Sequence, residues 1–140
     1  TAAGVEAALE RQLGGVASRP RPESSAAASA ECRDAPNYCA SIARGVDVAR
    51  AQGQQVLVVT QPFLLAPIRE RHVRQQQEMA AMVTRRYGAD ANVRYLNLGD
   101  LVDLSDERMA GDRMHTTAPG NARIAAALAD PVLELAAGRR

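Results

Sequence analysis

Hydrophobic side chains recur every three or four positions in four parts of the chain, which is the spacing of amphipathic helices. The predicted helices cover residues 2–13, a segment from beyond Pro36 that stops at Gly53, residues 69–87, and a final segment that begins at Thr117. The final helix has Thr117 as candidate N-cap, and its apolar stripe is formed by Ile124, Leu128, Val132 and Leu135. Pro131 is expected to kink this helix or to split it in two, because proline lacks the backbone N–H that a helix interior needs.

Two short apolar runs predict the strands of a parallel sheet. Residues 55–60 are rich in β-branched side chains and apolar on both faces, as in a strand buried between helix layers. Residues 92–98 form the second run. The elements alternate as they do in α/β proteins, in which crossover helices join parallel strands. Because two strands cannot supply partners for both edges of the first one, we expect the chain to be part of a larger domain.

Two further segments carry no helical or strand period. Residues 16–34 are rich in Ser, Ala, Pro and Arg, which predicts a long surface loop. Residues 99–117 are predicted to be irregular. The chain is therefore divided into an N-terminal helix with a Ser/Pro/Arg-rich loop at residues 1–36 and an α/β portion at residues 37–140.

The composition excludes several classes of function. The chain has 140 residues, enough for one domain, with 46 % hydrophobic residues, 24 % charged residues and a formal net charge of +1. This balance argues against an acidic disordered tail and against a basic arm that binds nucleic acid. All 17 basic residues are arginine, which indicates a compositional habit rather than a binding surface. No apolar run approaches the roughly 20 residues that a membrane-spanning helix needs.

The two cysteines, Cys32 and Cys39, are compatible with a local disulfide or with two free thiols. A four-ligand zinc site is unsupported, because no other Cys or His lies close to them in sequence. A disulfide across so short a loop would stabilise the fold by about 2–3 kcal/mol. It would also indicate an oxidising compartment and thus a secreted or periplasmic protein.

The candidate chemistry lies in the loop before the last helix, where Asp112 and His115 are three residues apart. A carboxylate at this spacing can accept a hydrogen bond from Nδ1 of the imidazole, which leaves Nε2 outward as a base. The loop follows the second strand, and open α/β sheets bind their ligands beyond the carboxyl ends of their strands. The same two residues are compatible with a surface pair, a helix cap or two metal ligands, although a metal site needs three or four.

The segment from Asp112 to Ala125 resembles the signature of a hydrolase family. Its pattern, Asp112-x-x-His115-x-Thr117-x-x-Gly120-Asn121-x-x-Ile124-Ala125, is similar to the C-terminal block of the SGNH (GDSL-type) hydrolases. Residues 56–62 and 97–101 also resemble pieces of that family, so the resemblance extends over about residues 37–135. It implies a flavodoxin-like three-layer α/β/α fold in which His115 is the general base, Asp112 orients it and a serine attacks a carboxylic ester.

The resemblance further implies the ligands of the protein. The expected partner is a small-molecule, lipid or carbohydrate ester, with no cofactor, no metal and no nucleic acid. Gln61, Pro62 and Phe63 follow the first predicted strand, and they are candidates for lining a substrate cleft on the same side of the sheet as His115.

The family's other motifs are missing from the chain. Neither the Gly-Asp-Ser that supplies the nucleophile nor the Gly-x-Asn-Asp that supplies oxyanion donors is present. We therefore expect residues 37–140 to be the C-terminal part of such a domain, inactive alone, with the serine encoded ahead of Thr1. A competing interpretation is a noncatalytic α/β interaction module that keeps the Asp–His loop as structure. His72 is expected to be solvated, and Gly120 to allow close helix approach beneath His115.

Overall fold

The computed structural model describes residues 31–62, 66–112 and 115–138. The helix predicted over residues 2–13 lies outside these ranges. The described elements follow in the order α3 (Pro36–Ala51), β1 (Val56–Val59), η1 (Ala66–Ile68), α4 (Arg69–Tyr87), β2 (Val93–Leu96), α5 (Leu98–Leu101) and α6 (Ala118–Ala136). Both predicted strands and the three long helices predicted within the described ranges are confirmed, with strand ends one or two residues shorter than expected.

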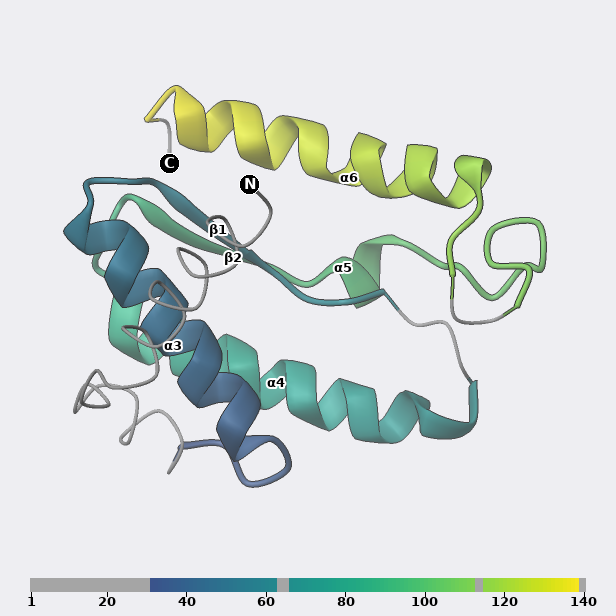
Figure 1. The fold of residues 1–140 in the computed structure, drawn as a ribbon, viewed down its shortest axis with the longest axis horizontal. Coiled ribbons are helices and arrows are strands. Elements are labelled where there is room, and N and C mark those ends of the chain that lie inside the picture. Colours follow the sequence, from purple (N-terminus) through teal and green to yellow (C-terminus); the bar gives the residue numbers. More distant parts are fainter. Residues whose placement is uncertain (1–30, 63–65, 113–114, 139–140) are drawn as a thin grey trace, which may run out of the picture.

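The two strands pair in parallel, which makes this an α/β arrangement. Val56 is opposite Val93, and the register continues to Val59 opposite Leu96. Parallel strands cannot be joined by a tight turn, so the chain crosses back through α4 before it enters β2. As a consequence, both strands end at the same edge of the sheet. The loop between α5 and α6 lies beyond that edge (Figure 1).

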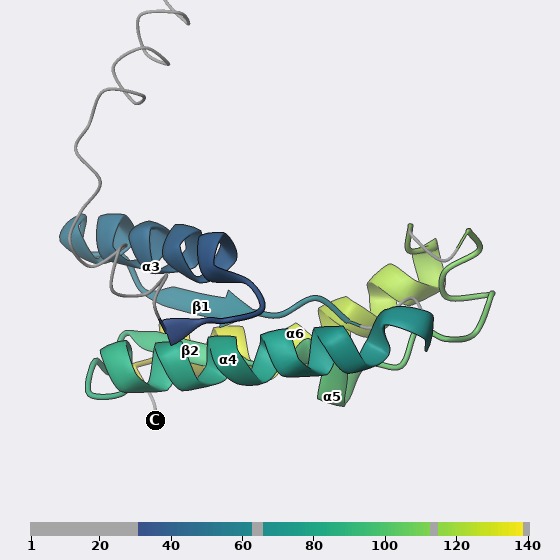
Figure 2. The ribbon, with the colours of Figure 1, turned by 90° about the horizontal axis from the view of Figure 1, so that it is seen from below.

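Helices lie on both faces of the sheet. The views in Figures 1 and 2 place α3 and α4 on one face and α6 on the other. The core between the sheet, α3 and α4 consists of Cys32, Cys39, Ala43, Val46, Val58, Met79, Met82, Val83 and Val93. A second buried cluster, Leu98, Val102 and Leu104, packs against α6 through Ile124, Ala127 and Leu128. The segment that leads from β2 to the loop of Asp112 and His115 (the Asp–His loop) is therefore held against α6 by apolar contacts.

A disulfide joins Cys32 to Cys39, with 6.3 Å between their Cα atoms. Both cysteines are buried in the core cluster between the sheet, α3 and α4, and Cys39 belongs to α3 itself. The backbone N–H groups of Arg33 and Asp34 donate to the carboxylate of Glu78 on α4, each at 3.0 Å. Of the predicted surface loop at residues 16–34, only the end from residue 31 is described. Arg33 and Asp34 are exposed there as expected, while Cys32 is buried and the disulfide and Glu78 tie this end to the core.

Three further expectations need correction. α6 continues through Pro131 as one helix, so the predicted split is wrong. Val132 was expected in the buried stripe but is 48 % exposed, because the helix rotates it away from the sheet and buries Leu135 instead. The region predicted to be irregular opens with the short helix α5, which begins where the Asn97 side chain accepts the backbone N–H of Gly99. None of the described helices is long and apolar enough to cross a membrane.

Truncation of the buried Met82 should destabilise the protein. The side chain is fully buried between α4 and α3, so Met82→Ala leaves a cavity and should lower the free energy of unfolding by about 2–5 kcal/mol. Val132→Ala on the exposed side of α6 is the control and should change it by less than about 0.5 kcal/mol. Urea unfolding followed by circular dichroism measures both, and equal losses would contradict the described core.

Candidate active site

Asp112 and His115 make the contact that their spacing predicts. The Nδ1 atom of His115 lies 2.5 Å from Oδ2 of Asp112. The second carboxylate oxygen accepts the backbone N–H of His115 at 2.6 Å, so the carboxylate holds both the ring and its backbone. The His115 side chain is 82 % exposed, which leaves the far side of the ring open to a reactant.

The carboxylate changes the acidity of the imidazole. The hydrogen bond that Nδ1 of His115 donates to Asp112, assisted by the negative charge of the carboxylate, raises the pKa of His115 above its ordinary value of 6.5. Because folding raises this pKa, the pair contributes to stability below the pKa of the unfolded imidazole. That contribution is lost as the pH rises through the folded value. A base at this position is neutral, and thus able to accept a proton, only above the raised pKa.

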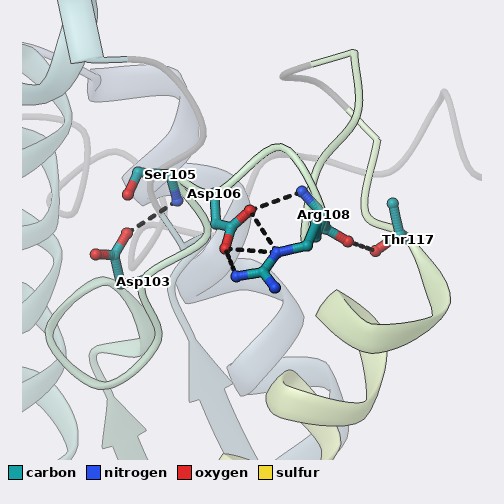
Figure 3. Close-up of polar contacts among 5 residues, drawn as sticks. All are labelled: Asp103, Ser105, Asp106, Arg108 and Thr117. Atoms are coloured by element: carbon teal, nitrogen blue, oxygen red, sulfur yellow. Dashed lines mark hydrogen bonds and ion pairs between the residues drawn. The ribbon is translucent and has the colours of Figure 1, made fainter.

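Polar contacts fix the loop ahead of His115 (Figure 3). The carboxylate of Asp106 accepts the backbone N–H of Arg108 at 2.9 Å and its Nη2 at 2.7 Å. These hydrogen bonds lower the pKa of Asp106 to about 2, so the pair stays charged at neutral pH. The carbonyl of Arg108 in turn accepts the hydroxyl of Thr117 at 2.5 Å. The loop is therefore closed between Arg108 and Thr117, with the Asp–His pair between the two.

Thr117 also begins α6. Its side-chain oxygen accepts the backbone N–H of Gly120 at 3.3 Å, and its own N–H donates to the carbonyl of Met109 at 2.9 Å. A Cβ atom on Gly120 would lie 2.3 Å from that same carbonyl oxygen, so only glycine allows this approach. The close approach that the sequence predicts at Gly120 is made to the backbone of Met109.

The remaining positions of the block also have local roles. The hydroxyl of Thr116 donates to Oδ1 of Asn121, which ties the residue after His115 to the first turn of α6. Ile124 packs on the buried Leu98 cluster. The pattern that carries the family resemblance is therefore a set of capping, close-packing and anchoring positions that hold His115 and Asp112 beside the start of α6.

The carboxyl ends of the two strands are joined by a buried threonine. The hydroxyl of Thr60 donates to Oδ1 of Asn97 at 2.8 Å and accepts the backbone N–H of Leu98 at 3.0 Å. Nδ2 of Asn97 donates to Asp100 at 2.8 Å. This network fixes the point where β2 turns into α5 and thereby the start of the segment that leads to His115.

The residues expected to line a substrate cleft are only partly brought together. Gln61 lines a pocket of about 250 Å³ beside the end of β1, and Pro62 is buried next to it. Phe63 lies outside the described residues. Neither His115 nor Asp112 lines this pocket. The residues that share it with Gln61 include Tyr38, His72, Gln75, Gln76 and Met79.

His72, which the sequence predicts to be solvated, is half-buried and lines this pocket. The charged residues around it in sequence suggested solvent, whereas the helix turns its face toward β1. The helical period of the sequence carries a signal for this position. His72, Gln76 and Met79 are spaced by four and three positions, which places polar and apolar groups together on the sheet-facing side of α4.

Within the described ranges, no group of three or more His, Cys, Asp or Glu side chains is arranged to hold a metal ion. The chain matches no protein-family model, and no curated protein or solved structure shows significant similarity to it. The functional assignment therefore depends on the geometry of the Asp112–His115 pair and on the residues of its loop.

Replacement of Asp112 should lower the pKa of His115. Asp112→Asn removes the charge but keeps an oxygen for the His115 backbone N–H, so the pKa should fall toward 6.5. An NMR pH titration of the imidazole signals measures this, with Asp130→Asn on α6 as the matched carboxylate control. An identical His115 titration in wild type and both variants would show that the carboxylate does not act on the ring.

Two glycine substitutions test the close approach at the start of α6. Gly120→Ala forces its Cβ atom against the Met109 carbonyl and should lower the free energy of unfolding by about 1–3 kcal/mol. Gly45→Ala, in open space within α3, should raise it by about 0.5–1 kcal/mol, because alanine favours the helix. Urea unfolding of both variants gives the comparison. A stabilised Gly120→Ala would contradict the contact with Met109.

Proposed function

We propose that Asp112 and His115 are the orienting carboxylate and general base of a serine ester hydrolase of the SGNH type. The observation that supports this most directly is the 2.5 Å contact between Oδ2 of Asp112 and Nδ1 of a ring that is otherwise exposed. The resemblance of the Asp112–Ala125 block to that family gives the reaction class. On this proposal, the two strands described belong to a flavodoxin-like three-layer α/β/α domain.

The chemistry follows from the tautomer that Asp112 selects. A proton on Nδ1, directed at the carboxylate, leaves the lone pair of Nε2 free to accept a proton. As a serine hydroxyl attacks the ester carbonyl, Nε2 of His115 takes its proton. The imidazolium formed is stabilised by Asp112 and then returns the proton to the departing alcohol. Water repeats the sequence to release the acid and restore the serine.

The proposal needs a nucleophile and oxyanion donors beyond the described residues. Among residues 31–62, 66–112 and 115–138, no serine or threonine hydroxyl forms a hydrogen bond with the His115 ring. The substrate class on this proposal is a small-molecule, lipid or carbohydrate ester. The buried disulfide between Cys32 and Cys39 accords with a secreted or periplasmic setting, since such bonds persist in oxidising compartments.

Loss of the base should abolish most of the turnover. In the full gene product, His115→Ala should lower kcat/KM for p-nitrophenyl acetate by about 10²–10⁴-fold, the contribution of a positioned general base. Because the pKa of His115 is raised, kcat/KM should increase with pH through that value. Asp112→Asn should reduce the rate and move the increase to lower pH.

Asp130→Asn is the matched control for Asp112→Asn and should leave the rate and its pH profile unchanged. Circular dichroism of each variant reports whether the fold is retained. An unchanged rate in a folded His115→Ala protein would overturn the proposal. It would favour the alternative, a noncatalytic α/β interaction module in which the Asp–His loop is structural.

A further inference from the structure

The pocket beside the end of β1 is a second candidate site, separate in its lining residues from the Asp112–His115 pair. It holds about 250 Å³ and opens between the start of α3, the segment after β1 and the first half of α4. This volume is just below the roughly 300–1,000 Å³ of drug-sized sites, so it suits a smaller ligand of about a dozen non-hydrogen atoms.

One lining side chain is buried with unused hydrogen-bonding capacity. Gln76 is only 7 % exposed, and its Nε2 donates to the backbone carbonyl of Gln61 at 2.8 Å. Because a carbonyl can only accept, this bond requires the nitrogen of the Gln76 amide to face Gln61 and its oxygen to face the other way. The amide oxygen, Oε1, is buried and has no hydrogen-bond partner in the described part of the chain. A buried acceptor without a donor is costly, so a ligand that brings a hydroxyl or N–H group to Gln76 gains a hydrogen bond that the protein itself does not make.

The chemistry of the lining favours an uncharged ligand. The described residues around the pocket bring amide groups, an imidazole, hydroxyl groups and a thioether, and they include no carboxylate and no guanidinium. A charged ligand would lose its hydration without gaining an opposite charge. Tyr38, 47 % exposed, adds an aromatic ring that can pack on the C–H face of a sugar.

The wall that carries Tyr38 is held in place before any ligand arrives. Tyr38 is in the first turn of α3, within the segment that the disulfide between Cys32 and Cys39 closes. Asp34, in the same disulfide-closed segment, is anchored to α4 by its backbone N–H on Glu78 and by its carboxylate on Arg74 at 2.9 Å. A preorganised wall lowers the ordering cost of binding.

From these observations we propose that the pocket binds a neutral polyhydroxylated molecule of monosaccharide size, with a ligand hydroxyl donating to Oε1 of Gln76. The other amide groups of the lining can exchange further hydrogen bonds with the remaining hydroxyls. The ring of Tyr38 covers one side of the sugar. This inference does not depend on the proposed hydrolase function, because none of these residues belongs to the Asp–His loop.

The test is an NMR titration of the chain with methyl β-D-glucopyranoside. The side-chain amide signals of Gln61 and Gln76 should shift, with a Kd on the order of millimolar. Glucuronate and glucosamine, which carry a negative and a positive charge on the same ring, should bind at least about fivefold more weakly.

Three variants give the residue-level test. Gln76→Leu and Tyr38→Ala should each raise the Kd by about 5- to 10-fold, the range expected for one lost hydrogen bond or aromatic contact. Val48→Ala, at an equally exposed site on α3, is the control and should leave the Kd unchanged. If Gln76→Leu fails to fold, Tyr38→Ala decides, because its side chain is half exposed and outside the core cluster.

The proposal is overturned if no shift occurs with any of the three sugars. It is also overturned if a charged sugar binds at least as tightly as the neutral one, or if Tyr38→Ala and Val48→Ala behave alike. His115→Ala should bind the neutral sugar with the wild-type Kd, so failure of the hydrolase proposal and failure of this one give different results.

Discussion

The parallel pairing of β1 with β2 is the contact on which the rest of the described structure depends. Its register, from Val56 opposite Val93 to Val59 opposite Leu96, ends both strands at one edge of the sheet. Because parallel strands need a crossover, α4 must cover one face before β2 can form. The segments that leave the two strands then meet at the same edge, where the Thr60 hydroxyl joins them through Asn97. The Asp–His loop and the pocket beside α4 both lie toward that edge of the sheet.

Most of the positions in the segment from Asp112 to Ala125 hold the backbone in place and do not themselves take part in chemistry. Thr117 caps α6 and returns to Arg108 and Met109, while Gly120 is the residue that lets the two backbones approach. Their combined effect is to hold His115 in an exposed position at the end of a fixed loop. An exposed ion pair adds little to stability because water screens it. The contact between His115 and its carboxylate therefore has two local effects: it holds the His115 backbone N–H, and it raises the pKa of the imidazole.

The pocket is held by contacts of a different kind. Its wall depends on a disulfide and on Glu78, which receives two backbone N–H groups from the loop that the disulfide closes. These contacts tie the start of α3 to α4, whereas the loop of His115 is tied to α6. The two candidate sites are therefore held by helices on opposite faces of the sheet (Figure 1). A substitution in the pocket wall therefore need not disturb the loop of His115.

The sequence by itself determined the features that depend on neighbours along the chain. The bounds of α4, the cap of α6 and the pairing of Asp112 with His115 follow from periodicity, capping chemistry and a spacing of three residues. Only the tertiary structure decided the burial of Gln76, the place of His72 in the pocket lining and the packing of the segment ahead of α3. Their positions depend on how α4 rests on the sheet and on a contact with Glu78 more than forty residues away. Such contacts between distant segments leave no period in the sequence, because each is fixed by how whole elements pack.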